Sequence, residues 1–379
     1  MIKDFKCSAP WEGLFINPDG DCRVCCAGQS LGNLNKTTLE EIVNGETLSN
    51  VRNDILTKGH SNYCVNCMES EEKSGKSLRD GFSKDFTNFD TSKFIPRTLD
   101  IRWRNTCQLR CGYCNSEWSS AYAQWEGKTI RVSEKDWQTN VLDYIKKDSE
   151  INTLNLLGGE PLLLKENLEL LDQVDDTTSI GIVTNLSVVD VETLPVYQKL
   201  KTKYVAWLVS LEAIGNKFEY IRRNAKWSIT KSNYESLELD NSTNGHKGCH
   251  MTYCILSAFS LVEVFDWLYE VDSNPETNHS FISILLGPSE FSIHSFPAEI
   301  KVLAIKELDR LLEKHNDFLN KQTKDFIIST RQSLLDCLHE YNQVSINEFK
   351  KYIKKSDVEM APIKFSDEWP EVYEILMRV

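Results

Sequence analysis

The sequence predicts an α/β protein with a parallel sheet, followed by a helical extension. Short apolar segments alternate with amphipathic stretches from residue 98 to about residue 286, and the stretches at 133–147 and 167–174 have a helical pattern. Strands that alternate with helices imply parallel βαβ units. The expected strands lie at 99–103, 153–157, 180–184, 204–211, 251–256 and 281–286.

The segment before these strands, 1–90, is expected to form a small unit of its own. Its turn sequence at 17–21, Asn-Pro-Asp-Gly-Asp, predicts a hairpin. A short helix is expected at 37–45, because this segment has a capping-box start and ends in glycine. A second helix is expected from about 47 to 57, and a polar linker from about 69 to 92.

The rest of the chain is expected to divide into the alternating region, 95–290, and a C-terminal extension, 291–379. Within the alternating region the long polar stretch at 230–248 is expected to be a loop or insertion. After Pro297 the pattern is mostly helical, with helices expected at 301–314 and 323–341.

Composition restricts the class of protein. The net charge of −13 argues against a general nucleic-acid scaffold, because phosphate binding needs a positive surface. The start of the chain has no apolar signal-peptide core, and the apolar stretches are too short or too interrupted to span a bilayer. The 12 cysteines cluster in short intervals instead of spreading as pairs, so we expect a reducing cytoplasm and cysteines used as metal ligands.

Three cysteines form the most informative motif. Cys107, Cys111 and Cys114 give a C-x3-C-x2-C run just after the first expected strand. Three thiolates on one short loop can hold three irons of a [4Fe–4S] cube and leave the fourth iron open to a ligand. By spacing alone they could also bind zinc with a remote fourth ligand, or be buried small hydrophobes.

With Tyr113 before the last cysteine, this segment resembles the cluster motif of the radical S-adenosylmethionine (radical SAM) superfamily. The resemblance implies a partial (β/α)6 barrel of TIM-like type, a cluster with one open iron, and S-adenosylmethionine as cofactor. Reduction of the cluster would release a 5′-deoxyadenosyl radical, which removes a hydrogen atom from the substrate. It also implies a flavodoxin- or ferredoxin-type reductant.

Later strand ends carry residues similar to the family's cofactor contacts. The string Gly158-Gly159-Glu160-Pro161 follows the second strand; two glycines let the backbone approach a ligand, and a carboxylate can accept from an ammonium group. Singly, each such residue could equally be a strand-end polar group or a surface arginine. The cofactor-binding residues that the resemblance implies are Tyr113, Gly158, Gly159, Glu160, Pro161, Asn185, Ser210, Glu212 and Arg222.

The resemblance also implies roles for three of these residues. Ser210 would bind the ribose, and Glu212 stands where the family often has aspartate. Arg222 would hold the cofactor carboxylate, since a guanidinium suits a bidentate grip.

A second cysteine set lies at the front of the chain. Cys7 and Cys25, with Gly20 between them, give a C-x12-G-x4-C pattern, and Cys64 and Cys67 can supply two more thiolates. This set resembles the auxiliary-cluster motif of SPASM and twitch domains, although those domains usually follow the barrel. The resemblance implies a second, fully ligated [4Fe–4S] cluster; four thiolates would also suit a structural zinc ion.

Cys22 and Cys26 are spare candidates for the second set. Cys254 on the fifth strand could donate a hydrogen atom to a product radical, but the favoured interpretation is a buried structural cysteine.

Three functions follow from these observations. The first is a radical SAM enzyme that abstracts a hydrogen atom from a peptide or protein substrate. The second is the same chemistry on a small molecule, such as a sugar, an amino acid or a nucleoside-linked metabolite. The third is a non-catalytic iron–sulfur redox protein, against which the glycine string argues, because an electron relay needs no cofactor amine site.

Overall fold

The computed structural model describes residues 7–74, 77–82, 90–128, 137–237, 239, 245–285 and 287–379. The chain forms two compact units, each built from several segments. Unit 1 comprises Met1–Cys107, Lys128–Ile182 and Leu194–Val205. Unit 2 comprises Gln108–Gly127, Val183–Thr193 and Ala206–Val379.

The sheet of unit 1 has the strand order β7-β6-β4-β1-β2-β3. Strands β1, β4, β6 and β7 pair in parallel, whereas β2 and β3 are antiparallel additions. Because β1 pairs with β4, the sheet continues across the residues where the front unit was expected to end. The strands are β1 (Gly13–Ile16), β2 (Asp21–Arg23), β3 (Gly32–Asn33), β4 (Thr98–Ile101), β6 (Thr153–Leu156) and β7 (Ser179–Thr184), the last belonging to this unit through residue 182.

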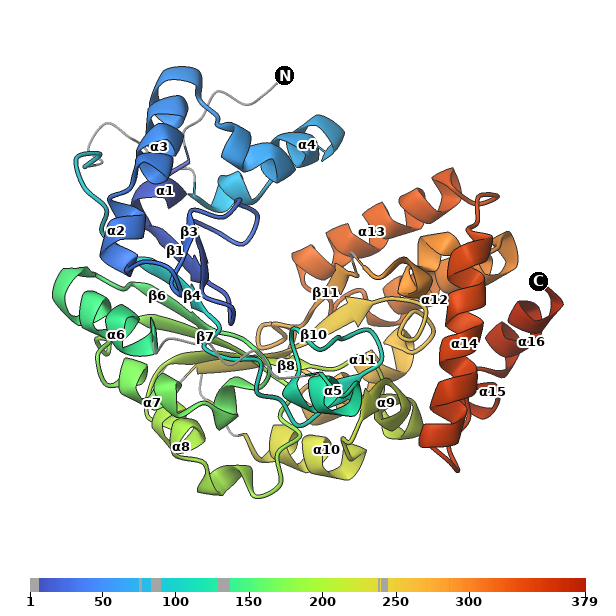
Figure 1. The fold of residues 1–379 in the computed structure, drawn as a ribbon. Helices are drawn as coiled ribbons and strands as arrows, with labels where there is room; N and C mark the ends of the chain where they lie inside the picture. Colours follow the sequence, from blue (N-terminus) through green and yellow to red (C-terminus); the bar gives the residue numbers. More distant parts are fainter. Residues whose placement is uncertain are drawn as a thin grey trace. The chain divides into compact units, whose positions relative to one another are not determined.

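Helices cover one face of this sheet. Along β4 and the residues after it, Leu99, Ile101 and Trp103 are buried, while the alternate residues are only half-buried. Helices α6, α7 and α8 lie on the buried side (Figure 1), and Trp103 stacks on Trp137 of α6 with ring centroids 5.6 Å apart. The helices of unit 1 are α1 (Ala9–Glu12), α2 (Leu39–Val43), α3 (Glu46–Lys58), α4 (Val65–Ser74), α6 (Trp137–Asp148), α7 (Lys165–Leu171) and α8 (Pro195–Lys201).

The local signals in the front segment are confirmed. The expected hairpin is β1–β2, and its turn uses Gly20 at a φ of +80°, where a side chain would be strained. Helix α2 begins at Thr38, which forms a capping box with Glu41. Helix α3 ends at Gly59 in the left-handed conformation.

The expected polar linker from 69 to 92 is wrong over the part that the structure describes. Helix α4 runs to Ser74, and a 3-10 helix occupies Leu78–Phe82. A buried ion pair between Arg79 and Glu71, 2.6 Å long, joins the two and explains why so polar a segment is folded.

Unit 2 contains two groups of strands. Strands β8 (Val205–Ser210, in this unit from residue 206), β10 (Gly245–Tyr253) and β11 (Phe281–Ile284) follow each other in the order β8-β10-β11, with β10 and β11 parallel. Strands β5 (Arg110–Cys111) and β9 (Arg222–Arg223) form a separate antiparallel pair.

Helices make up most of the rest of unit 2. Helix α13 packs against β11 and α12 against α11, so the C-terminal helices share a core with the strands. These helices are α5 (Ser120–Trp125), α9 (Gly215–Ile221), α10 (Trp227–Ser236), α11 (Leu261–Val271), α12 (Ala298–His315), α13 (Lys321–Asp336), α14 (Gln343–Glu359), α15 (Phe365–Glu368) and α16 (Pro370–Arg378).

The α/β class with a parallel sheet and the helical C-terminal extension is confirmed. The expected loop at 230–248 is wrong at both ends, because α10 continues to Ser236 and β10 begins at Gly245. Helix α13 ends at Asp336, before the expected 341. The expected helix start at 133–136 and strand end at 286 lie outside the described residues. In the part of the chain that the structure covers, no helix is long and apolar enough to cross a membrane.

Candidate functional site

The cysteine loop of unit 2 is held by a strand pair that sequence reasoning missed. Strand β5 pairs with β9 so that Cys111 lies opposite Arg222 and Arg110 opposite Arg223. The Gly112 N–H extends this pair by donating to the Ile221 carbonyl at 2.8 Å. The backbone that carries Cys111 is therefore fixed to a segment more than a hundred residues away in the chain.

Arg222 brings three of the predicted site residues together. Its Nε and Nη2 each donate to a carboxylate oxygen of Glu212 at 2.7 Å, and both side chains are buried. The guanidinium also reaches the Tyr113 hydroxyl at 3.2 Å and the Cys111 Sγ at 3.7 Å. Burial alone would lower the pKa of Arg222, but the Glu212 carboxylate outweighs it and holds that pKa well above its usual range.

The thiols of this loop are buried enough to resist ionisation on their own. Burial raises the pKa of Cys111 despite the opposing Arg222 cation, and it raises the pKa of Cys114 to about 12. A bound metal deprotonates a coordinating thiol outright, so these sulfurs suit metal binding better than free-thiolate chemistry. Cys107 is half-buried and is the last residue of its segment of unit 1.

Side chains from two other segments of unit 2 also fix the loop. Gln108 donates through Nε2 to the Asn185 Oδ1 at 2.9 Å, at the end of β7. The Gln108 carbonyl accepts from Asn224 at 3.1 Å, and the Leu109 carbonyl accepts from Ser119 at 2.6 Å. Asn185 was predicted as a cofactor contact from the resemblance, and the structure places it against the cysteine loop. Gln108 was not predicted.

Ser210 and Cys254 occupy contrasting positions. Ser210 is the half-buried last residue of β8. Cys254 follows β10 and is fully buried, and its Sγ accepts from the Ser257 hydroxyl at 3.7 Å. Burial raises the pKa of Cys254 to about 11. A hydrogen-donor role for Cys254 stays a prediction.

In unit 1 the glycine segment packs directly on the residues before Cys107. A Cβ at Gly159 would lie 2.3 Å from the Thr106 carbonyl oxygen, so only glycine fits there. The Glu160 N–H donates to the same carbonyl at 2.7 Å. Gly158 has a φ of +127°, which also requires glycine. The glycine segment and the start of the cysteine motif, some fifty residues apart in sequence, are thus in contact at Thr106.

The Glu160 carboxylate lies at the start of a short 3-10 helix in unit 1. It is fully buried, and its Oε1 accepts from the Leu162 N–H at 3.2 Å. The Pro161 carbonyl accepts from Asn167 at 2.8 Å, and Asn167 in turn accepts from the Trp103 indole at 2.8 Å. Binding of the cofactor amine by this segment stays a prediction.

The second cysteine set of unit 1 lines one pocket. Cys7, Cys25, Cys64 and Cys67 all contribute to its wall, whereas Cys22 and Cys26 do not. The rest of the lining is mostly apolar: Ala9, Pro10, Val24, Ala27, Gly28, Leu78 and Phe82 surround the sulfurs, and Arg79 completes the wall.

The electrostatics of this pocket link its four thiols. Burial first, and then the proximity of Cys25, Cys64 and Cys67, raises the pKa of Cys7 to about 12. Burial also raises the pKa of Cys25 to about 12 and that of Cys64. Four thiols in one apolar pocket match in number and kind the donors that a [4Fe–4S] cluster takes, and their role as ligands stays a prediction. Among the described residues, no group of three or more His, Cys, Asp and Glu side chains could hold a single metal ion.

Arg79 is the charged residue in the lining of this pocket, and no sequence motif predicts a role for it. Its guanidinium is buried and donates to both Glu71 carboxylate oxygens, at 2.8 and 2.6 Å. Its Nη1 donates to the Gly59 carbonyl at 2.9 Å, at the end of α3. The Glu71 carboxylate holds the pKa of Arg79 above its usual range, so a permanent cation stands beside the cysteines.

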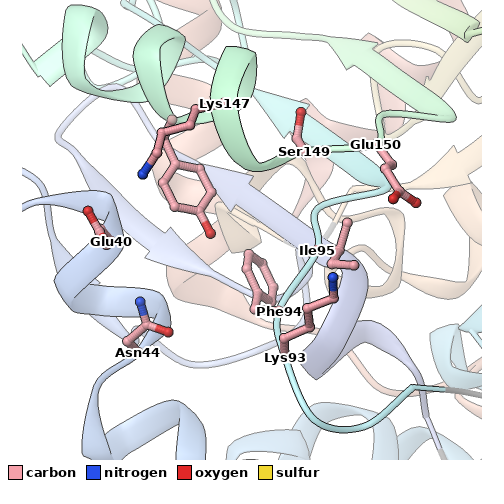
Figure 2. A pocket seen from close by; sticks show the side chains of 9 residues that line it. Glu40, Asn44, Lys93, Phe94, Ile95, Lys147, Ser149 and Glu150 are labelled. Carbon is pink, nitrogen blue, oxygen red and sulfur yellow. The ribbon is translucent and has the colours of Figure 1, made fainter.

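A further pocket of unit 1 lies apart from both cysteine sets. Figure 2 shows Lys93, Phe94 and Ile95 on one side of it, with Asn44 of α2 and Lys147 of α6 around them. Its lining balances two lysines against Glu40 and Glu150 and contains no cysteine. No residue predicted for the site lines it.

Each of the two cysteine sets lies in a segment that matches a protein-family model. Residues 101–239 match the family model of the radical SAM superfamily. Residues 7–68 match the model of SPASM, an iron–sulfur cluster-binding domain. A radical SAM domain implies a [4Fe–4S] cluster and S-adenosylmethionine, and a SPASM domain implies a further cluster, so the predicted cofactors are confirmed. No curated protein matches the chain.

Solved structures show only distant similarity. A structure of anSMEcpe with bound AdoMet is 14% identical over 58% of this chain and 60% of its own, with a TM-score of 0.40. Streptococcus suis SuiB is 15% identical over 82% of this chain and 69% of its own, also with a TM-score of 0.40. The chain thus spans about 60% of the length of anSMEcpe.

The assignment of the two domains rests on the sequence matches, because structural similarity with TM-scores of 0.40 carries no argument about function. Both matched segments contain the cysteines whose surroundings are described above. The chain carries a radical SAM domain at residues 101–239 and, in front of it, a SPASM iron–sulfur cluster-binding domain at residues 7–68.

Proposed function

We propose that this chain is an enzyme that cleaves S-adenosylmethionine reductively and abstracts a hydrogen atom from a peptide or protein side chain. When bound, the cofactor supplies a 5′-deoxyadenosyl radical, which takes a hydrogen atom from an unactivated carbon. The observation that carries the proposal is the junction at Thr106, where the glycine segment packs on the residues that lead into the cysteine loop.

The junction is consistent with both motifs serving one ligand. The close approach of Gly159 to Thr106 leaves no room for a side chain, so the backbone of 158–160 is held rigidly beside the chain that enters the loop. An electron-relay protein needs the cysteines but not this fixed glycine backbone. The arrangement therefore supports a cofactor site over a simple redox centre.

The residues of unit 2 would prepare the loop for a cluster. Arg222 is a permanent cation 3.7 Å from the Cys111 Sγ, and a cation at that distance favours the thiolate. Glu212 fixes the direction of the guanidinium by a bidentate contact. Because the guanidinium is already paired with Glu212, any contact to a cofactor carboxylate would use Nη1 or Nη2 in addition to that pair.

The peptide substrate rests on the SPASM domain, because the resemblance is to a group of proteins that includes peptide-maturing enzymes. We propose a flavodoxin- or ferredoxin-type protein as the electron donor. The same chemistry on a small molecule is the alternative. A short peptide encoded beside this chain that takes part in turnover would support the first substrate class, and turnover with small metabolites alone would support the second.

Anaerobic reconstitution with iron, sulfide, S-adenosylmethionine and dithionite tests the enzyme reaction. We expect formation of 5′-deoxyadenosine and methionine, and about eight irons per chain by the stoichiometry of two four-iron cubes. Replacing Cys107, Cys111 and Cys114 together by alanine should abolish both products and leave about four irons.

The control for this experiment is Cys337→Ala, which removes a thiol at the end of α13, outside both cysteine sets. It should leave products and iron content unchanged. Colourless protein with zinc in the cysteine loop, or the same product yield in the triple variant, would contradict the proposed function.

A further inference from the structure

Helix α14 of the C-terminal extension is attached to the strand pair that carries Cys111. Glu359, at the end of α14, lies 3.4 Å from the Arg110 Nη1 and 3.7 Å from the Arg223 Nη1. Arg110 and Arg223 are opposite each other in the β5–β9 pair, so one carboxylate bridges both strands. One turn earlier, the Ser356 hydroxyl accepts from the Arg223 Nη2 at 2.5 Å.

One more turn toward the start of α14, Tyr352 points into the cysteine loop. Its ring lies under the Arg223 guanidinium, whose carbon is 4.9 Å from the ring centroid. A Cβ built on Gly112 would lie 2.1 Å from the Tyr352 hydroxyl oxygen. The hydroxyl thus fills the space that a side chain between Cys111 and Tyr113 would take, which explains the glycine there.

The Tyr352 hydroxyl is buried and meets the geometry of no hydrogen bond among the residues that the structure describes, although the Ser356 hydroxyl acts to lower its pKa. Its ring is fixed on the other side by aromatic contacts with Phe291 and Phe349, at centroid distances of 4.8 and 5.7 Å. A buried donor without a partner is unfavourable and calls for an explanation. A rigid side chain that presents such a donor to a loop of metal-binding cysteines suggests that the partner is a group bound by that loop.

We propose that Tyr352 is a positioning residue that donates a hydrogen bond to a sulfur of the cluster at the cysteine loop, either the Cys111 or Cys114 sulfur or a bridging sulfide. This inference rests on the proposed function, because it requires the cluster. It adds a role for the C-terminal extension: α14 supplies a hydrogen bond to the cluster from outside the matched radical SAM segment.

The chemistry of the phenol suits this role. Burial raises the pKa of Tyr352 to about 12, so the hydroxyl keeps its proton at neutral pH and can only donate to an anionic sulfur. Hydrogen bonds to cluster sulfurs are among the factors that set the reduction potential. A donor stabilises the more negative, reduced cluster, so Tyr352 should raise the potential.

The test is Tyr352→Phe in the full, anaerobically reconstituted chain, because this change removes only the hydroxyl. A matched control is Tyr253→Phe on β10. Tyr253 is also buried, with a hydroxyl that has no partner among the described residues, but its ring packs on Phe326 of α13. The signal of the loop cluster is identified as the one lost when Cys107, Cys111 and Cys114 are replaced by alanine.

Redox titration followed by electron paramagnetic resonance should show a more negative midpoint potential for the loop cluster in Tyr352→Phe, with unchanged iron content. Tyr253→Phe should match the wild type. As a second readout, resonance Raman iron–sulfur bands should shift between light and heavy water in the wild type and lose part of that shift in Tyr352→Phe.

Two results would overturn this inference in different ways. An unchanged potential and an unchanged solvent shift in iron-replete Tyr352→Phe would show that Tyr352 only packs against the loop, and would leave the enzyme proposal intact. A wild-type chain that assembles no cluster at the loop, while it keeps its iron at the SPASM cysteines, would defeat the proposed function itself and the role of Tyr352 with it.

Discussion

The two cysteine sets lie in very different surroundings. The SPASM pocket of unit 1 gathers four thiols among apolar side chains, with one cation that is already bound to Glu71. The cysteine loop of unit 2 is instead held by side-chain hydrogen bonds that involve Arg222, Gln108 and Asn224.

The two cysteine sets also differ in what the arginine beside them contacts. In the pocket, Arg79 donates hydrogen bonds to Glu71 and to the Gly59 carbonyl. In the loop, Arg222 is shared between Glu212 and the Cys111 sulfur itself. The first arginine fixes the pocket wall, and the second acts on a cysteine directly.

The largest expected effect comes from Arg222→Met. The change leaves Glu212 buried without its cation, and breaking a buried pair in this way costs about 3–5 kcal/mol. It also removes the cation beside Cys111. Urea unfolding should show the loss of stability, and iron analysis should show loss of the loop cluster alone. Arg97→Met, which breaks an exposed pair with Glu150, should cost less than about 1 kcal/mol.

Arg79→Met is expected to have the next largest effect, and on the other cluster. It too breaks a buried pair, at a cost of about 3–5 kcal/mol, but the site keeps its apolar wall and its four thiols. We expect partial loss of the SPASM cluster, with the product yield from uncoupled cofactor cleavage retained. Loss of the loop cluster in this variant, measured by its paramagnetic signal, would contradict the independence of the two regions.

The smallest expected effect is a pH dependence confined to unit 2. His250 on β10 bonds Ser283 at 2.7 Å, and burial lowers its pKa; the Glu212 carboxylate opposes this shift and the Arg222 cation adds to it. Because the folded pKa lies below the unfolded value of about 6.5, the unfolded chain binds the proton first and stability falls as the pH drops below about 6.5.

Protonation of His250 can change the free energy of unfolding by at most about 1.4 kcal/mol per pH unit. His250→Gln should flatten the stability profile between pH 5 and 6.5, measured by urea unfolding, while the profile above pH 7 keeps its shape. An equal slope in the variant would show that the acid sensitivity arises elsewhere.

The sequence contained the local signals of both cysteine sets but not their surroundings. The cysteine spacings, the glycine string and the capped helices are short-range patterns, and each could be recognised within a few residues. The pairing of Gln108 with Asn185, or of Arg79 with Glu71 across two helical segments, depends on how the chain folds back, and no local pattern encodes it.

The wrong prediction of a loop at 230–248, where β10 begins, has a different cause. The stretch at 230–248 is polar enough to suggest a loop, and His246 and Lys247 in the first part of β10 are only half-buried. Further along the strand, the buried residues Cys249, Met251 and Tyr253 alternate with the half-buried His250 and Thr252, so a period-two pattern was present from residue 249. The strand begins earlier, where paired histidine rings 3.8 Å apart replace apolar contacts.

The short β5–β9 pair also has a consequence for how this protein can vary. Side chains alternate sides along a strand, so a slip of one residue in this pair would turn the Cys111 thiol away from the arginine it now faces. A single deletion inside either two-residue strand would therefore move the Cys111 sulfur to the wrong side of the pair.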